Sequence, residues 1–359
     1  MPEFEIQAPL VGGAGNEQTL SSLGWSAELA DNLEQGLAPG RVIAVHRGAF
    51  DVATARGNVR ARLPGRLAYD GADVAVGDWV ALAGASIRSV LPRRSAIVRS
   101  AAGPSSKSQT LAANVDVAFV VSSLGPDLEP RRIERYLVTI WDSGAVPEIV
   151  LTKADRMGDP WGLVGEVEAV AVGVPVHVVS AVTGQGCDAL RARMVEGTTA
   201  VLLGSSGVGK STLVNRFVGR EVMTVNETRV DDDEGRHTTT HRELIQLPGG
   251  GIVIDTPGLR ELQLWNGGAD SVGHAFSDVE ALAADCRFND CRHGSEPGCA
   301  VQAALRSGEL SPERHRSWLK LQRELRAMAV RADARLRREE KRKWQRRARE
   351  GRSRARHRQ

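Results

Sequence analysis

Several features of other protein classes are missing from this chain of 359 residues. No apolar run approaches the roughly 20 residues that a membrane-spanning helix needs, and the N-terminus lacks the basic-then-apolar pattern of a signal peptide. The absence of internal repeats excludes a repeat array. Cysteine is limited to four residues, of which Cys187 stands alone and is expected to be a small, buried or half-buried side chain. We therefore expect a soluble, cytoplasmic protein without membrane contacts.

Charge is distributed unevenly along the chain. Residues 331–359 carry fourteen Lys and Arg against four Asp and Glu, whereas the remainder carries 33 against 40. The stretch 335–347 has no Gly or Pro and is predicted to continue a helix that opens at Ser311 and Pro312. Such a tail would bind nucleic-acid phosphates in a salt-dependent way, with RNA as the favoured partner. A solvated tail with no fixed partner is the alternative.

The clearest motif is a phosphate loop of the form G-x-x-x-x-G-K-[ST]. Residues 198–203 predict a buried strand that enters the loop, and residues 211–217 predict a helix that leaves it. Glycines let backbone N–H groups turn toward phosphate oxygens, and the helix N-terminus favours negative charge. We expect Lys210 to reach the β- and γ-phosphates as a catalytic contact, and Ser211 to ligate Mg²⁺. The predicted nucleotide-binding residues here are Gly204, Ser205, Ser206, Gly207, Val208, Gly209, Lys210, Ser211 and Thr212.

A guanine-reading motif begins at Thr152, where many GTPases carry Asn. It follows an apolar strand, at the carboxyl end where open α/β sheets bind ligands. The Asp155 carboxylate can accept hydrogen bonds from N1–H and N2–H₂ of guanine, and the Lys153 stem would cover the base plane. A second apolar strand ends in Ser180 and Ala181, which are predicted to lie beside guanine O6. All five residues are therefore predicted to bind GTP.

The order of these motifs is unusual. Small GTPases place the phosphate loop before the base reader, whereas here the base reader comes first. This order predicts a circularly permuted G domain.

A D-x-x-G motif follows another apolar strand, residues 251–254. Asp255 is expected to hold Mg²⁺ through water, and the Gly258 N–H to sense the γ-phosphate. The polar segment before it suits a mobile switch whose threonine closes on Mg²⁺. Spacing to the next predicted strand favours Thr239 as this ligand and catalytic contact, with Thr240 as the alternative.

The glutamine that orients the attacking water in Ras-like enzymes is absent, because Leu259 occupies its position. We therefore expect slow intrinsic hydrolysis that another group or a bound partner completes. His237 is the nearest catalytic candidate, since its imidazole titrates near neutrality beside the switch threonines. The alternative is that His237 only packs or is solvated in a flexible loop.

Three of the four cysteines lie with a histidine inside fourteen residues: Cys286, Cys291, His293 and Cys299. Three thiolates and an imidazole satisfy a tetrahedral, structural zinc site with no open position. The alternative, a disulfide plus an odd thiol, suits a secreted protein and is disfavoured.

The first third of the chain reads as short strands at residues 41–57, 59–64, 78–82 and 86–91. This spacing suggests a small β-barrel of the five-stranded OB type, whose loops and one strand face commonly bind oligonucleotides. Arg93, Arg94 and Arg99 add positive charge at its exit. Trp79 is expected in the barrel core, with stacking on a base as the alternative.

Together these motifs resemble the RsgA/YjeQ family, the bacterial small ribosomal subunit biogenesis GTPases. The likeness covers about residues 38 to 325, and its most specific pieces are residues 76–80, 113–116, 151–155, 204–212, 237–240, 255–259 and the cysteine run. The family also lacks the glutamine. The acidic switch segment and the long basic tail depart from its pattern and leave the function of the tail open.

The resemblance implies a multidomain protein. We predict a variable leader (1–37), an OB-fold RNA-binding β-barrel (38–102), a circularly permuted α/β P-loop GTPase domain (103–268), an α-helical zinc-binding domain (269–328) and a basic helical tail (329–359). It further implies a monomer that binds the 30S subunit and its 16S rRNA late in maturation. Hydrolysis of GTP to GDP and phosphate would be stimulated by that subunit and followed by release.

Two other functions stay open. A regulated RNA-binding switch would hydrolyse GTP only incidentally. A His237 variant distinguishes the two functions, because an enzyme would lose the stimulation of GTP hydrolysis by its partner while still binding that partner. An ATPase or metabolic kinase could use the same phosphate loop. A variant at Asp155 tests this alternative, because Asp155→Asn should shift the base preference of a guanine-binding site toward xanthine.

Overall fold

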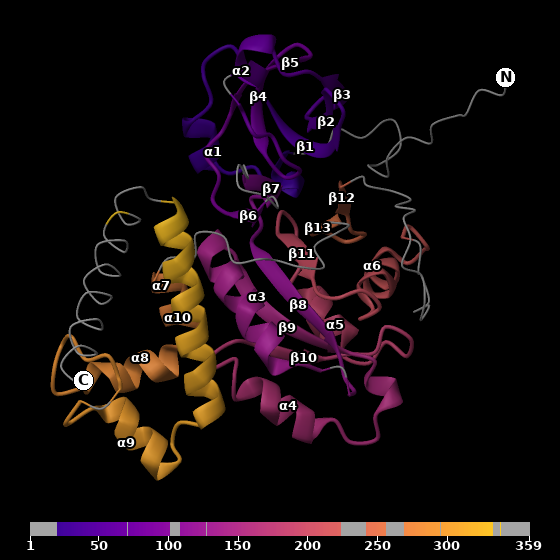
Figure 1. The fold of residues 1–359 in the computed structure, drawn as a ribbon. Helices are drawn as coiled ribbons and strands as arrows, with labels where there is room; N and C mark the ends of the chain where they lie inside the picture. The colour runs from indigo at the N-terminus through magenta and orange to yellow at the C-terminus, as the bar shows by residue number, and fades with distance from the viewer. Residues whose placement is uncertain are drawn as a thin grey trace, which may run out of the picture. The chain divides into compact units, whose positions relative to one another are not determined.

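The computed structural model describes residues 20–69, 71–100, 108–126, 128–223, 242–255, 269–294, 296–332 and 338. The chain divides into two compact units, Met1–Gln263 and Leu264–Gln359. The first combines a β-rich N-terminal region with an α/β region, and the second is helical (Figure 1). Among the described residues, no helix has both the length and the apolar composition that a membrane span requires.

The N-terminal region is built from short antiparallel strands, as predicted. They pair in the order β3-β2-β1-β4-β5, and an isolated parallel bridge joins Arg62, after β3, to Ser86 of β5. Their inward-facing side chains, among them Val42, Val80 and Ile87, form a buried cluster. Trp79 is fully buried, as expected for a core residue, but it packs against Trp25 and the Arg41 guanidinium and is not part of this cluster. The bounds are η1 Leu20–Leu23, α1 Ala27–Asp31, β1 Ala38–His46, β2 Ala49–Thr54, β3 Gly57–Ala61, α2 Gly65–Tyr69, β4 Trp79–Ala83 and β5 Ser86–Val90.

A central sheet follows in the order β10-β9-β8-β11-β13-β12. Neighbouring strands are parallel except for β12, which pairs antiparallel with β13. A separate two-stranded ribbon, β6-β7, precedes this sheet in the chain. The bounds are β6 Ala96–Ser100, β7 Ser108–Ala113, β8 Val117–Ser123, β9 Val146–Thr152, β10 Val176–Val178, β11 Thr199–Leu203, β12 Glu243–Gln246 and β13 Ile252–Asp255.

Helices pack against this sheet. Leu190 of α5 and Leu213 and Phe217 of α6 join Phe119 of β8 and Leu202 of β11 in one buried cluster. Helix α3 packs against β8 and β9. The bounds are α3 Pro130–Ser143, η2 Ala154–Arg156, α4 Trp161–Glu168, α5 Cys187–Ala192 and α6 Lys210–Val218.

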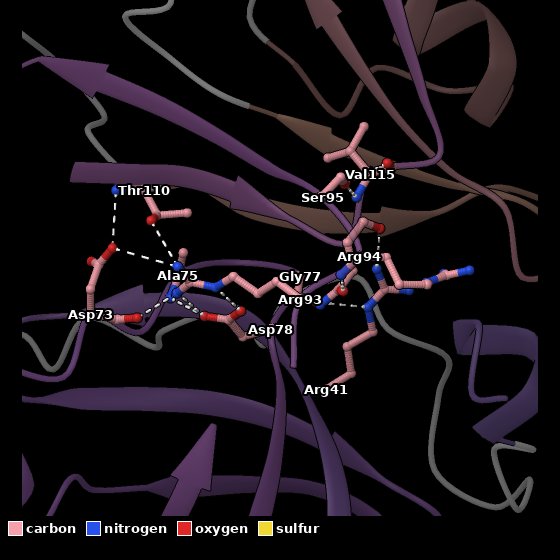
Figure 2. A network of polar contacts seen from close by, with 11 residues as sticks. Arg41, Asp73, Ala75, Gly77, Asp78, Arg93, Arg94, Ser95, Thr110 and Val115 are labelled. Atoms are coloured by element: carbon pink, nitrogen blue, oxygen red, sulfur yellow. Dashed lines mark hydrogen bonds and ion pairs between the residues drawn. The ribbon is translucent and has the colours of Figure 1, made fainter. Parts of the chain in front are cut away.

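A network of polar groups connects β1 and the segment before β4 to ribbon β6-β7 and the residues that follow it (Figure 2). Strand β1 pairs with β12 at Ala44 and Glu243. Nearby, Arg41 of β1 is only 1% exposed. Its guanidinium donates to the Asn114 carbonyl at 3.3 Å and to Thr199 Oγ1 at 2.8 Å. Strand β11, which runs into the phosphate loop, is thereby hydrogen-bonded to the N-terminal region.

The same network explains the motif at residues 76–80. Asp78 is fully buried and accepts hydrogen bonds from Arg93 at 2.7 and 2.8 Å (Figure 2). Burial raises the pKa of Asp78 above its ordinary value, although Arg93 opposes the shift. Gly77 has a φ of 91°, and a Cβ there would lie 2.1 Å from the Ala113 carbonyl oxygen. The acid and the glycine therefore serve the fold of this junction.

The C-terminal unit contains four described helices, whose buried residues include Val279, Val301 and Trp318. Helix α10 begins as predicted, with the Ser311 hydroxyl accepting from the Arg314 N–H at 3.1 Å and Pro312 in first position. The basic tail beyond Ala332 lies outside the described residues, apart from Arg338. The bounds are α7 Ala269–Ala275, α8 Ser277–Ala284, α9 Ala300–Ser307 and α10 Pro312–Ala332.

Candidate nucleotide and metal sites

The phosphate-loop sequence forms a tight arch between β11 and α6. Its glycines Gly204, Gly207 and Gly209 have φ angles of 150°, 74° and 98°. A Cβ on Gly204 would lie 2.2 Å from the Val121 carbonyl oxygen, so no larger residue fits there. Lys210 Nζ reaches back over the arch and donates to the Gly204 carbonyl at 2.7 Å. Strand, arch and helix follow one another as the sequence predicts.

Thr152 ties the base-reading motif to this loop. It ends β9, and its single hydroxyl proton is donated to the Val208 carbonyl at 2.5 Å, with the Ser122 carbonyl at 3.2 Å as a second acceptor in reach. Lys153 follows in the left-handed region, with a φ of 61°. The threonine that replaces the usual asparagine thus holds the two motifs together, although they lie more than fifty residues apart in the chain.

The two predicted halves of the base pocket also meet. Ser180 Oγ donates to Asp155 Oδ1 at 2.6 Å and accepts from the Thr183 N–H at 3.1 Å. Strand β10 stops at Val178 and is therefore shorter than the predicted strand, so Ser180 and Ala181 lie in the loop after it. The Asp155 carboxylate is therefore hydrogen-bonded to the loop of Ser180 and Ala181, which the sequence predicts to lie beside guanine O6.

Asp255 lies at the same edge of the sheet as the phosphate loop. It ends β13, which runs parallel to β11 with Val201 opposite Ile254. Ser211 and Thr212 lie in the first turn of α6. His237, Thr239, Thr240, Gly258 and Leu259 lie outside the described residues.

Sequence reasoning missed two arginines near this edge. Arg132 of α3 donates from Nη1 to Ser205 Oγ at 2.9 Å and pairs with Glu129 at 2.8 Å. It lines a cavity of about 470 Å³ together with Lys153 and residues 205–208. Arg216 of α6 contacts the loop after β10. No spacing rule could reveal either contact, because both depend on how distant segments pack.

The cysteine-rich segment folds into a compact ligand set that can hold a metal. One ligand atom from each of Cys286, Cys291, His293 and Cys299 lies within 4.8 Å of the others. Tetrahedral zinc requires about 3.8 Å between two sulfurs and about 3.6 Å between sulfur and nitrogen. The Cys286 and Cys299 sulfurs are 3.9 Å apart, and His293 Nδ1 lies 3.5 and 3.6 Å from them. All described cysteines are free thiols, so the disulfide alternative fails.

Neighbouring groups fix this ligand set. Gln302 Nε2 donates to the His293 carbonyl at 2.7 Å, and Cys299 caps α9. The His293 ring packs edge-on against Trp318 of α10. The isolated Cys187 is 4% exposed, as predicted for a small packing residue.

Comparison with known proteins points in one direction. The model of the RsgA GTPase family matches residues 90–265. The small ribosomal subunit biogenesis GTPase RsgA of Streptomyces avermitilis is 50% identical, covering 91% of this chain and 90% of the relative. Its counterpart in Streptomyces coelicolor is 48% identical over 92% and 93%.

Two solved structures share the fold. YjeQ from Thermotoga maritima aligns with a TM-score of 0.62 and 27% identity over 80% of this chain and 98% of that one. YloQ, described as a circularly permuted GTPase, aligns with a TM-score of 0.59 and 22% identity over 82% and 96%.

Proposed function

Because the chain belongs to the RsgA family of small ribosomal subunit biogenesis GTPases, we propose that GTP binds and is hydrolysed where its phosphate loop and base-reading loops meet. One observation carries this proposal. Thr152 and Ser180 hydrogen-bond the base motif to the phosphate loop and to the second base loop, at the carboxyl ends of parallel strands. Open α/β sheets bind ligands at that edge.

Each described residue has a proposed role. The backbone of residues 204–212 holds the phosphates, and Lys210 moves from the loop carbonyls to the β- and γ-phosphates. Asp155 accepts from the guanine N–H groups while Ser180 holds its other lone pairs, and Lys153 covers the base. Thr152 and Ala181 complete the pocket wall.

Magnesium fits the oxygen donors at this edge. When bound with GTP, Mg²⁺ supplies positive charge against the β- and γ-phosphates. We assign Ser211, Asp255 and Thr239 to hold it, with Thr240 as the alternative to Thr239, and Gly258 to sense the γ-phosphate. Oxygen ligands of this kind are what Mg²⁺ prefers.

Hydrolysis needs a water aligned with the γ-phosphorus, and Leu259 cannot orient it. We propose that the free protein is therefore slow and that docking on the 30S subunit orders the switch segment. Water then attacks, the bond from the γ-phosphorus to the β–γ bridging oxygen breaks, and GDP and phosphate leave. His237 is the proposed water-positioning group.

The proposed partner is the 30S subunit through its 16S rRNA. The strand order β3-β2-β1-β4-β5, with the bridge from Arg62 to Ser86, supports an OB-type barrel in residues 38–102. Barrels of that type present loops to oligonucleotides. The basic tail, residues 329–359, adds a contact that weakens steeply with salt. A role on ribosomal subunits would place the protein in the cytoplasm, and we propose that it acts there as a monomer.

The ligand set in residues 269–328 is proposed to hold one structural Zn²⁺. The separations among Cys286, His293 and Cys299 match those of a zinc tetrahedron, and the Cys291 sulfur lies within 4.8 Å of these atoms as the fourth ligand. Four protein ligands support a folding role and leave no position for substrate. The remaining proposed parts are the G domain, residues 103–268, and a leader, residues 1–37. Within that leader, Leu23 and Leu29 are buried.

The test is GTP turnover by the full chain with and without 30S subunits, with ATP as the control. A large stimulation that requires both GTP and 30S supports the proposal. Equal slow rates would sink it and leave a GTP-binding switch. His237→Ala then decides the catalytic role, because a water-positioning group would be needed for stimulation but not for binding to 30S.

A further inference from the structure

Arg216 links the two ends of the proposed nucleotide site. It lies in the last turn of α6, the helix that begins with Lys210 at the phosphate loop. Its Nη1 donates to the Ala181 carbonyl at 3.2 Å and to the Val182 carbonyl at 3.4 Å. These carbonyls belong to the loop that carries Ser180. One helix therefore contacts the phosphate-binding segment at its start and the base-binding loop at its end.

The loop is shaped around this guanidinium. At Gly184, which has a φ of 91°, a Cβ would lie 2.1 Å from Arg216 Nη2 and 2.9 Å from its Cζ. Any larger residue would push the guanidinium away as well as straining the backbone. Arg216, Ala181 and Thr212 also line one cavity of about 610 Å³. The close packing on Gly184 is a second observation, independent of the hydrogen bonds, that places Arg216 on this loop.

The contact restrains peptide planes rather than side chains. A carbonyl and the N–H of the following residue share one rigid plane, so fixing the Ala181 and Val182 oxygens orients the peptides that follow them. The same loop holds Asp155 through Ser180. Loss of the guanidinium would free the Ala181 and Val182 carbonyls from α6.

We propose that Arg216 is a positioning residue for guanine recognition: it ties the loop of residues 180–184 to α6 and so sets how long a guanine nucleotide stays bound. This inference rests on the proposed GTP site and assigns within it the group that controls nucleotide release. Arg216 touches neither the phosphates nor the base in this role. Its effect reaches the nucleotide through the loop backbone.

The test measures the dissociation rate of a fluorescent GDP analogue from the full chain. Arg216→Ala should accelerate the release of the GDP analogue by about three- to tenfold. The effect is smaller than for buried hydrogen bonds to a charged group, because the hydrogen bonds of Arg216 are exposed to solvent. Arg216→Lys should restore part of the dwell time, since an ammonium can reach one carbonyl. Arg220→Ala is the matched control, because Arg220 lines the same cavity and makes no hydrogen bond to the described residues of the loop.

Two further readouts separate positioning from general damage. The KM for GTP should rise in proportion to the release rate while kcat falls by less than twofold, and Gly184→Ala should reproduce the faster release. Arg216 is exposed, so its variants should keep the thermal unfolding midpoint of the wild type. If Arg216→Ala lowers that midpoint, Arg216→Gln provides a second comparison, because its side-chain amide can still reach the loop carbonyls.

The outcomes also separate this inference from the proposed site. If Asp155→Asn abolishes GDP binding while Arg216→Ala releases GDP at the rate of Arg220→Ala, the site stands and the positioning role is refuted. If Asp155→Asn leaves GDP binding unchanged, the base pocket itself is wrong, and the role of Arg216 falls with it.

Discussion

Replacement of Arg41 by methionine tests whether the buried guanidinium at the domain junction stabilises the protein. Besides Asn114 and Thr199, it donates to the carbonyls of Leu23 and Gly77. All four acceptors are neutral. Methionine keeps most of the aliphatic volume but removes the charge and every donor, so Arg41→Met isolates the polar contribution.

Two opposing terms decide the magnitude. The Gly77 carbonyl still accepts from Asn114 Nδ2 at 3.0 Å, and the Thr199 hydroxyl can rotate, so the Leu23 and Asn114 carbonyls suffer most. Two buried carbonyls that lose their donor cost about 2–6 kcal/mol. Against this, burial lowers the pKa of Arg41 from 12.5 to about 10, which corresponds to a charge penalty of about 3 kcal/mol that methionine relieves. The difference spans about −1 to +3 kcal/mol, so the central expectation is a destabilisation of about 1 kcal/mol.

Urea unfolding followed by tryptophan fluorescence measures this change. Trp79 lies 5.5 Å from the Arg41 guanidinium, and Trp25 lies 4.8 Å from Trp79, so their emission reports on this junction. Arg41→Ala adds a cavity and should cost about 2 kcal/mol more. Replacement of the exposed Arg60, which pairs with Asp51, is the control and should change the free energy of unfolding by less than about 1 kcal/mol. An Arg41→Met protein that is more stable than the wild type by over about 1 kcal/mol would refute the reasoning, because the charge penalty would then exceed the contribution of the hydrogen bonds.

Three further perturbations follow from the sites. Asp155→Asn should transfer nucleotide preference from GTP toward XTP, which competition binding with both nucleotides measures. Chelation, or Cys291→Ser, should release one zinc and unfold the C-terminal unit while GDP binding persists; metal analysis and hydrogen exchange check this, and a protected C-terminal unit after zinc loss would contradict it. Burial tends to raise the pKa of Glu148, but hydrogen bonds from His177 and Arg193 at 2.7 and 2.8 Å hold it below 4.5. The carboxylate therefore stabilises the fold above its unfolded pKa, and this contribution fades as pH falls through the lower folded value. Glu148→Gln should be less stable at pH 7 and show a flatter loss of stability below about pH 4.5 in acid titrations; an unchanged slope would show that the pair contributes nothing.

Local motifs predicted the parts of the site that are contiguous in the chain. The arch at Gly204 and the ligand set from Cys286 to Cys299 are encoded by residues within one short segment, where spacing and residue type suffice. The reversed order of the base-reading motif and the phosphate loop could also be predicted, because the order of motifs is a property of the sequence. The strands around them follow from apolar runs, although β10 ends before its run does because Ser180 turns to hold Asp155.

Contacts between distant segments could not be predicted in this way. Arg216 meets Ala181 across 35 positions, Arg132 meets Ser205 across 73, and Arg41 meets Thr199 across 158. From the sequence alone, an arginine in a helix or strand is predicted to be an exposed surface charge, because the packing of its neighbours is not known. The three residues differ in burial and partners, and each becomes informative only once the sheet order is fixed.

The sheet order also has a mechanical consequence. The chain enters the central sheet at the start of β8 and leaves it at the end of β13, and β11 lies between them, parallel to both. Tension along the chain would pull β8 and β13 in opposite directions along their length. Such a load shears the ladders on both sides of β11, so their hydrogen bonds must fail together rather than open one by one. The strand that carries the phosphate loop is thus clamped between the two points where force from either neighbouring domain arrives.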